Sequence, residues 1–188
     1  MQLSAIIIAG GKSSRMGSDK TKMIYRGQSL LQKAMELAGH FSADVIISSN
    51  GQVNTNAELS VFADEIPDIG PLGGLYTCLK HIKNRKTLVL PADMPLLDKN
   101  VLEYLIKKAD FQKDVNIFQV EGRRHPLVGI YDQNLLPLIE KQIADKDYKL
   151  RNLLQKSAFH LIDGSSFTAK FININTPDEW AKLQANNE

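Results

Sequence analysis

The residues with the clearest chemical potential lie near the N-terminus, where an apolar run ends in two glycines. Residues 7–20 read Ile-Ile-Ala-Gly-Gly-Lys-Ser-Ser-Arg-Met-Gly-Ser-Asp-Lys. Glycines allow close backbone approach and unusual dihedral angles, so amide N–H groups can point at phosphate oxygens. Arg15 and Lys20 can neutralise the charge of those phosphates. The segment therefore predicts a cradle for a triphosphate, and with it an enzyme that uses a nucleotide.

Two common phosphate-binding patterns are absent from this segment. A P-loop ends in Gly-Lys-Ser/Thr, but Gly17 is followed by Ser18 and Asp19. The dinucleotide fingerprint G-x-G-x-x-G is not present either. The alternative is a surface loop whose charges are only solvated. A double glycine directly after a buried-strand run favours the functional interpretation.

A second candidate is Asp93, which follows the short apolar run Thr87 to Leu90 in the sequence Pro-Ala-Asp-Met-Pro. This order places Asp93 just past the carboxyl end of a strand, the edge where ligands bind in open α/β sheets. A carboxylate there suits Mg²⁺, which binds one or two carboxylates together with substrate phosphates. A turn-capping aspartate is the alternative. Because the glycine turn should reach the same edge, we favour the metal role.

Further polar residues follow strand-like runs and could reach a base or ribose, namely Asn50, Asp64 and Asp68. The two aspartates could equally be solvated loop acids. Asn173 and Asn175 are two residues apart and would share one face of an extended segment. Because Thr176 before Pro177 is a typical helix N-cap arrangement, a purely local role for Asn175 stays open.

Three other segments leave their roles undecided. The run Gly70 to Gly74 offers backbone groups to a base or sugar, or is a plain turn and helix start. Two cationic clusters, Arg123 to Pro126 and Tyr148 to Arg151, could receive another phosphorylated substrate or be ordinary surface charge. The histidines His40, His81 and His160 lack the spacing of a transition-metal site.

The elements that must position these residues alternate between β-rich apolar runs and helical patterns, which predicts an α/β fold with a mostly parallel sheet covered by helices on both faces. Pro67 to Gly74 predicts a shaped loop before a helix at Leu75 to Ile82, and Phe171 to Ile174 predicts an extended segment. Other strands are expected at 3–9, 45–48, 61–62, 87–90, 115–120, 127–131 and 160–163. Helices are expected at 30–38, 100–109, 135–143, 149–154 and from Pro177, with a loop or irregular helix at 51–60.

Composition limits the possible classes of protein. The 188 residues suit one domain, 1–188, and the net charge of +2 without a polybasic run argues against nucleic-acid or membrane partners. The single cysteine, Cys78, cannot form an internal disulfide, which fits a reducing compartment. Ser4 to Ala9 is too short to span a membrane, and no cation precedes it as in a signal peptide. We expect a cytoplasmic protein, monomeric or weakly oligomeric.

The sequence resembles the molybdenum cofactor guanylyltransferase family over nearly its whole length. The blocks that carry the resemblance are Ile8-Ala9-Gly10-Gly11, Gly70-Pro71-Leu72, Asp93-Met94-Pro95 and Asn173-Ile174-Asn175-Thr176-Pro177. The resemblance implies a Rossmann-like three-layer sandwich of the nucleotide-diphospho-sugar transferase type. It also implies transfer of GMP from GTP to the terminal phosphate of molybdopterin, with Mg²⁺ as cofactor and molybdoenzymes or their chaperones as partners.

The resemblance also implies roles for individual residues. Guanine would be contacted by Ile8, Ala9 and Gly10, with Gly11 in the same nucleotide-binding turn, and the triphosphate by Lys20 and Arg15. Asn50 and Asp64 would contact nucleotide, and Asp93 would hold Mg²⁺. Asn173 and Asn175, with Lys149 or Arg151, would lie toward the pterin or the metal. The sequence departs from the family at Lys22, usually apolar, which could replace Lys20, and leaves the choice between Asp64 and Asp68 open.

The expected reaction is attack by one phosphate on the α-phosphorus of another polyanion. Arg15, Lys20 and Mg²⁺ at Asp93 would offset the repulsion and align the reactants. A phosphate nucleophile is already ionised near neutrality, its second pKa being about 6, so no general base is required. The alternatives are a nucleotidyltransferase that acts on a sugar phosphate or uses CTP, and a nucleotide-binding protein without catalytic activity.

Overall fold

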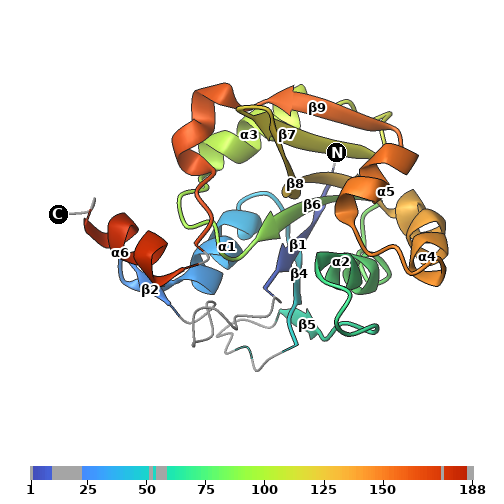
Figure 1. The fold of residues 1–188 in the computed structure, drawn as a ribbon, viewed down its shortest axis with the longest axis horizontal. Helices are drawn as coiled ribbons and strands as arrows, with labels where there is room; N and C mark the ends of the chain where they lie inside the picture. The colour runs from blue at the N-terminus through green and yellow to red at the C-terminus, as the bar shows by residue number, and fades with distance from the viewer. Residues whose placement is uncertain (1, 10–22, 51–52, 54–58, 175, 186–188) are drawn as a thin grey trace.

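The computed structural model describes residues 2–9, 23–50, 53, 59–174 and 176–185, and its centre is a seven-stranded sheet (Figure 1). The strand order is β5-β4-β1-β6-β8-β7-β9, and β8 is antiparallel to both of its neighbours while all other pairs are parallel. The prediction of a mostly parallel sheet is confirmed. The strands are β1 (Ser4–Ile8), β4 (Asp44–Ser48), β5 (Ser60–Phe62), β6 (Lys86–Pro91), β7 (Val115–Val120), β8 (Arg123–Asp132) and β9 (Phe159–Asp163).

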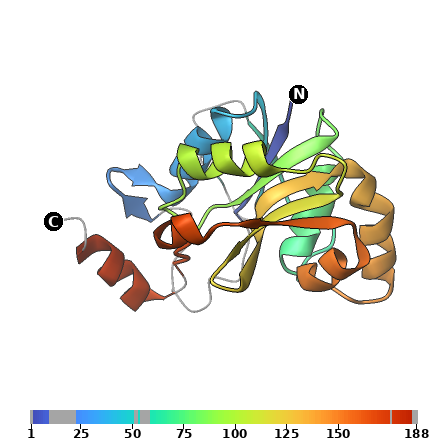
Figure 2. The ribbon, with the colours of Figure 1, turned by 90° about the horizontal axis from the view of Figure 1, so that it is seen from above.

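Helices cover both faces of this sheet, which gives three layers (Figures 1 and 2). Helices α1 (Leu30–Gly39) and α3 (Lys99–Lys108) pack on one face, and α2 (Pro71–Leu79), α4 (Leu136–Ala144) and α5 (Leu150–Lys156) on the other. A short hairpin of β2 (Ile24–Tyr25) and β3 (Gln28–Ser29) lies beside α6 (Pro177–Ala185) at one end of the molecule. Two 3-10 helices, η2 (Gln133–Leu135) and η3 (Ser165–Lys170), complete the described elements.

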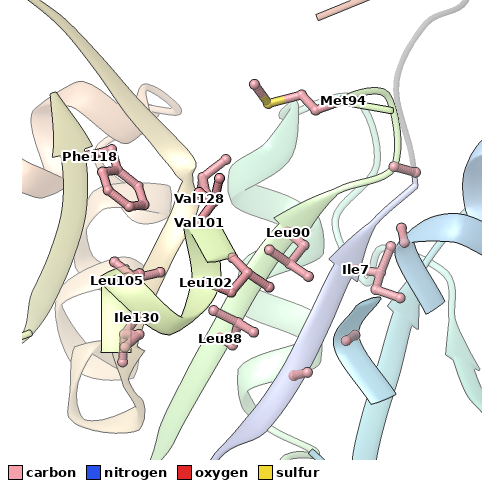
Figure 3. Packing of buried hydrophobic residues seen from close by; sticks show 14 of the residues in the cluster. Ile7, Leu88, Leu90, Met94, Val101, Leu102, Leu105, Phe118, Val128 and Ile130 are labelled. Atoms are coloured by element: carbon pink, nitrogen blue, oxygen red, sulfur yellow. The ribbon is translucent and has the colours of Figure 1, made fainter. Parts of the chain in front are cut away.

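Strand β1 explains why two helical layers are needed. All five of its residues are buried, and their side chains alternate between the two faces. Ile7 packs in one cluster with Leu88 and Leu90 (Figure 3), whereas Ile6 and Ile8 belong to the cluster on the opposite face. A strand that is apolar on both sides can lie only in the middle of such a sandwich.

Helix α1 begins where its sequence predicts. Ser29 accepts a hydrogen bond from the backbone N–H of Gln32, whose side chain accepts one from the N–H of Ser29, a complete capping box. The apolar stripe that includes Leu31, Ala34 and Ala38 is buried against the sheet, whereas Leu30 packs with Tyr25 and Ile174. The helix therefore covers the part of the sheet that is formed by β1, β4 and β6.

Two sequence predictions are wrong. Helix α2 begins at Pro71, so Gly73 and Gly74 lie within its first turns and not in a loop. Proline is well suited to the first helical position because its missing N–H is not needed there. A Cβ built on Gly73 would lie 2.9 Å from the carbonyl oxygen of Ile66, and one built on Gly74 would clash with Ser48 Oγ. The glycines are explained by close packing.

The described residues 171–174 form an irregular connection instead of a strand.

Other predicted elements differ mainly in their ends. Strand β8 begins at Arg123, four residues before the predicted start, and helix α4 is preceded by η2. The β2–β3 hairpin was not anticipated because its strands have only two residues each. Most of the predicted loop at 51–60 lies outside the described residues. No helix in the part of the chain that the structure describes is long and apolar enough to cross a membrane.

Candidate active site

The carboxyl ends of β5, β4, β1 and β6 form one edge of the sheet, which we call the carboxyl edge. Backbone hydrogen bonds between neighbouring segments continue past the ends of the strands. The N–H of Ala9 donates to the carbonyl oxygen of Ser48 at 2.9 Å, and the N–H of Ala92 donates to that of Ile8 at 3.0 Å. The residues that directly follow the strands are therefore held side by side.

Asp93 lies at this edge, two residues past the end of β6. Ile8 pairs with Pro91 and accepts a hydrogen bond from the N–H of Ala92, so the end of β1 lies beside the residues that lead to Asp93. The structure thus places Ile8, Ala9 and Asp93 together at one edge, as expected. Gly10, Gly11, Arg15, Lys20 and Lys22 lie outside the described residues, so their roles stay predictions.

Asn50 and Asp64 form a paired unit at the carboxyl edge, after β4 and β5. Asn50 Nδ2 donates to Asp64 Oδ2 at 3.1 Å, and the backbone N–H of Asp64 donates to Asn50 Oδ1 at 2.8 Å. Ser48 Oγ donates to the other carboxylate oxygen of Asp64 at 3.0 Å. These bonds fix the orientation of the Asn50 amide, which keeps one N–H for a further acceptor.

The hydrogen bonds to Asn50 distinguish the role of Asp64 from that of Asp68. Asp64 holds the Asn50 side chain, whereas Asp68 is exposed in the turn before α2, with a φ of 65°. The first turn of α2 also packs on this unit, because a Cβ built on Gly74 would lie 3.2 Å from Asp64 Oδ1. Asp64 is therefore the aspartate that the structure places with Asn50.

The segment 171–174 connects the far side of the sheet to Asp93. The backbone N–H of Ile174 donates to the carbonyl oxygen of Asp93 at 3.0 Å, and the Ile174 side chain is fully buried with Tyr25, Leu30 and Leu183. Asn173 is exposed directly before it, and Asn175 lies outside the described residues. Asn173 is thus exposed one residue before a backbone contact with Asp93.

The two cationic clusters occupy different places. Strands β6 and β7 both run antiparallel to β8, so the β7–β8 turn before Arg123 lies at the same edge as Asp93. Lys149 and Arg151 lie at the start of α5, which ends at Lys156 shortly before Phe159 opens β9. Because β9 is parallel to β7, α5 leads into the opposite edge. The pairing of the strands thus brings the first cluster to the carboxyl edge.

The donors at the carboxyl edge fit a magnesium ion better than a transition metal. Among the described residues, no group of three or more His, Cys, Asp and Glu side chains could hold a metal. Mg²⁺ does not need such a group, because it keeps several waters and takes one or two carboxylates plus substrate phosphates. His81 instead stacks on Phe62, with ring centroids 4.1 Å apart.

Sequence reasoning missed two contributors to this site. Ser48 was assigned only to a strand, although a hydroxyl at the end of the apolar run Val45 to Ile47 was a usable signal. The contact from Ile174 to Asp93 uses backbone atoms and leaves no trace in the residue types.

The mostly parallel sheet, with helices on both faces, is a fold that this chain shares with solved structures of α/β proteins. The 2-C-methyl-D-erythritol 4-phosphate cytidylyltransferase of Thermus thermophilus has a TM-score of 0.73 at 16% identity, with 99% of this chain and 98% of that chain covered. Molybdopterin-guanine dinucleotide biosynthesis protein A from Archaeoglobus fulgidus has a TM-score of 0.83 at 21% identity over 98% of both chains. These two likenesses support the fold.

The chain belongs to the family of the MobA-like NTP transferase domain, whose model matches residues 5–161. A "probable molybdenum cofactor guanylyltransferase" of Flavobacterium johnsoniae is 30% identical over 185 residues, which cover 98% of this chain and 97% of the relative. Its namesake in Clostridium perfringens strain 13 is 34% identical over 190 residues, which cover 96% and 95%. The resemblance read from the sequence motifs is confirmed.

Proposed function

We propose that this protein transfers GMP from GTP to the terminal phosphate of molybdopterin, forms molybdopterin guanine dinucleotide and releases pyrophosphate. The observation that carries the proposal is the full-length similarity to relatives of that name, at 30% and 34% identity. The meeting of Ala9, Asn50, Asp64 and Asp93 at the carboxyl edge supports it. The single buried cysteine is compatible with a reaction in the cytoplasm.

The nucleotide would occupy the β1–β4–β5 side of the carboxyl edge. The backbone of Ile8 to Gly10 would contact guanine, and Gly11 would continue the same turn. Asn50, held in one orientation by Asp64, would donate its remaining N–H to the nucleotide. Backbone donors and a fixed amide suit recognition of a base because they lose little conformational freedom on binding.

The chemistry requires that negative charge be offset at both reactants. Arg15 and Lys20 would bind the triphosphate through charge-assisted hydrogen bonds, and Asp93 would hold Mg²⁺. Mg²⁺, when bound by Asp93, would supply positive charge that offsets the charge of the phosphates. The chain then has to orient the acceptor phosphate in line with the α-phosphorus, and the phosphate needs no base because it is already ionised at neutral pH.

The acceptor would lie on the other side of Asp93, toward residues 171–174. Asn173 is exposed there, and its neighbour Ile174 is fixed to Asp93 by a backbone hydrogen bond. Asn173 would therefore contact molybdopterin or the metal. Asn175, two residues further on, is proposed for the same side.

The test is a turnover assay with purified protein, Mg²⁺, molybdopterin and each of the four nucleoside triphosphates. We expect pyrophosphate release and molybdopterin guanine dinucleotide only with GTP, and no turnover in excess EDTA. Equal turnover with CTP, or turnover with a sugar phosphate in place of molybdopterin, would refute the proposal in favour of another nucleotidyltransferase. Binding of GTP without pyrophosphate release would indicate a protein that only binds nucleotide.

A further inference from the structure

The β7–β8 hairpin carries cations to the carboxyl edge. Its turn is made by Glu121 and Gly122, both with positive φ (48° and 77°), which is the geometry of a tight two-residue hairpin turn. This turn places Arg123 directly opposite Val120, at the tip of the pair. In Figure 2 the hairpin extends past its neighbouring strands.

The two arginines of the hairpin point to opposite faces. Residues on a strand alternate, so Arg123 and His125 share one face and Arg124 lies on the other. The guanidinium of Arg124 lies 5.0 Å from the ring centroid of Phe159 on strand β9. The ring of His125 lies against Phe171, with centroids 4.6 Å apart.

The face of the hairpin that carries Arg123 packs on Phe171, in the segment that also contacts Asp93. Phe171 packs against His125 and also against Phe118, at 5.1 Å between centroids. Three residues later, Ile174 donates its N–H to the carbonyl oxygen of Asp93. A continuous series of contacts therefore runs from the hairpin to the candidate metal ligand.

A bulge fixes the direction of this hairpin. Ile117 pairs with Gly129 but Phe118 pairs with His125, so β8 has three extra residues, 126–128. The hydroxyl of Tyr131, whose side chain is fully buried, donates to the carbonyl oxygen of Pro126. A Cβ on Gly129 would lie 2.5 Å from the carbonyl oxygen of Asn116. Bulges next to active sites commonly re-aim side chains, and this one is held by buried contacts.

Arg123 is available for a ligand. It is exposed, and it makes no ion pair with any carboxylate among the residues that the structure describes. Burial and the nearby charge of Arg123 lower the pKa of His125 below its usual value, so the imidazole beside Arg123 is neutral at pH 7. A guanidinium can bind two phosphate oxygens at once, which an ammonium cannot do with the same geometry.

We propose that Arg123 binds the phosphate group of the acceptor substrate, on the side of Asp93 away from the nucleotide. The assignment rests on the proposed function. It makes the β7–β8 hairpin the acceptor side of the site, while Arg124 on the opposite face takes no part.

Arg123→Ala and Arg124→Ala are a matched pair for the test, since each removes one exposed cation from the same hairpin. We expect Arg123→Ala to raise the KM for molybdopterin by about tenfold or more, as for the loss of one charge-assisted hydrogen bond, and to leave the KM for GTP unchanged. Arg124→Ala should leave both KM values near those of the wild type. Arg123→Lys should recover part of the loss.

A binding measurement then assigns the effect to the phosphate. The affinity of wild type and Arg123→Ala is compared for molybdopterin and for its dephosphorylated form, and the variant should lose affinity only for the phosphorylated one. Equal losses in Arg124→Ala, a raised KM for GTP, or no change in Arg123→Ala would overturn the assignment. If the wild type itself does not turn over molybdopterin, the proposed function and this assignment fail together; an active wild type with an unaffected Arg123→Ala refutes the assignment alone.

Discussion

The backbone N–H of Ile174 and the carbonyl oxygen of Asp93 are joined by a hydrogen bond of 3.0 Å, although 81 positions separate the two residues (174 minus 93). This bond fixes the segment after η3 to the loop that follows β6. Ile174 is fully buried against Tyr25 and Leu30, so the segment is anchored by its side chain as well. The proposed acceptor side therefore has a fixed position relative to the proposed metal ligand.

The first prediction concerns the carboxylate of Asp93. Asp93→Ala should reduce kcat by at least about a thousandfold, because an ion that offsets transition-state charge contributes several kcal/mol. The variant should still unfold cooperatively, since the backbone bond to Ile174 does not need the side chain. Turnover with GTP and thermal unfolding measure the two effects.

Asp98→Asn is the matched control for this variant. Asp98 caps α3 through the N–H of Val101 and pairs with Lys170 at 2.9 Å, five residues from Asp93. The amide oxygen of asparagine can keep the cap while the charge is lost. Full activity of Asp93→Ala, or an equal loss in Asp98→Asn, would remove Asp93 from the mechanism.

A second prediction concerns the glycines of α2. Gly74→Ala should destabilise the protein by about 1–3 kcal/mol, because the new Cβ meets Ser48 Oγ and lies 3.2 Å from Asp64 Oδ1. Gly39→Ala is the control: its Cβ would have no neighbour within 4 Å at the end of α1, and alanine should stabilise the helix there by up to about 1 kcal/mol. Urea unfolding of both variants tests the pair, and equal free energies of unfolding would contradict it.

These glycines also show where the sequence is informative and where it is not. The order of strands and helices follows from hydrophobic patterns, since a run such as Ile6 to Ile8 must be buried on both faces. The start of α2 cannot be predicted from these patterns, because glycine and proline usually indicate a loop. Here they are required by packing against Ser48 and Asp64, which are distant in the sequence.

The candidate site was predictable in part for the same reason. Residues directly after strands, such as Ala9 and Asp93, could be placed at one edge from topology alone. The choice between Asp64 and Asp68 could not be made, because it depends on the side-chain bonds to Asn50 and Ser48. The orientation of the β7–β8 hairpin depends on a bulge. The residues around Pro126 do not indicate how β7 and β8 pair, so this bulge could not be predicted.

A third prediction concerns the pH dependence of stability. Asp132 is 1% exposed and contacts Lys86 at 2.8 Å and Arg85 at 2.9 Å. Burial alone would raise the pKa of Asp132, but hydrogen bonds from Arg85, Lys86 and the Asn134 backbone outweigh it and lower the pKa below the usual value. A lowered folded-state pKa stabilises the protein above the unfolded-state pKa, about 3.9, and this stability is lost as the pH falls through the folded-state value.

Asp132→Asn should therefore flatten the loss of stability below about pH 4. At pH 7 it should lower the free energy of unfolding by about 3 kcal/mol, because the buried Lys86 ammonium loses its partner. Asp145→Asn, an exposed acid with no described ion pair, should change neither quantity. Urea unfolding between pH 2.5 and 7 is the measurement, and parallel curves for wild type and Asp132→Asn would contradict the prediction.

The last prediction concerns the only cysteine of the chain, Cys78, which is fully buried in α2. Burial, and to a smaller extent the charge of Asp64, raises the pKa of its thiol to about 12. The thiolate is the reactive form, so at pH 8 native protein should react with a thiol reagent only through transient opening, whereas protein in concentrated urea should react at the rate of a free cysteine. Colorimetric titration should find no reactive thiol in native protein within minutes and one per chain after unfolding.

The Cys78 thiol of Gly74→Ala should be labelled faster than that of Gly39→Ala, because opening is favoured when α2 is destabilised. Rapid labelling of the native wild type would show that α2 does not shield Cys78.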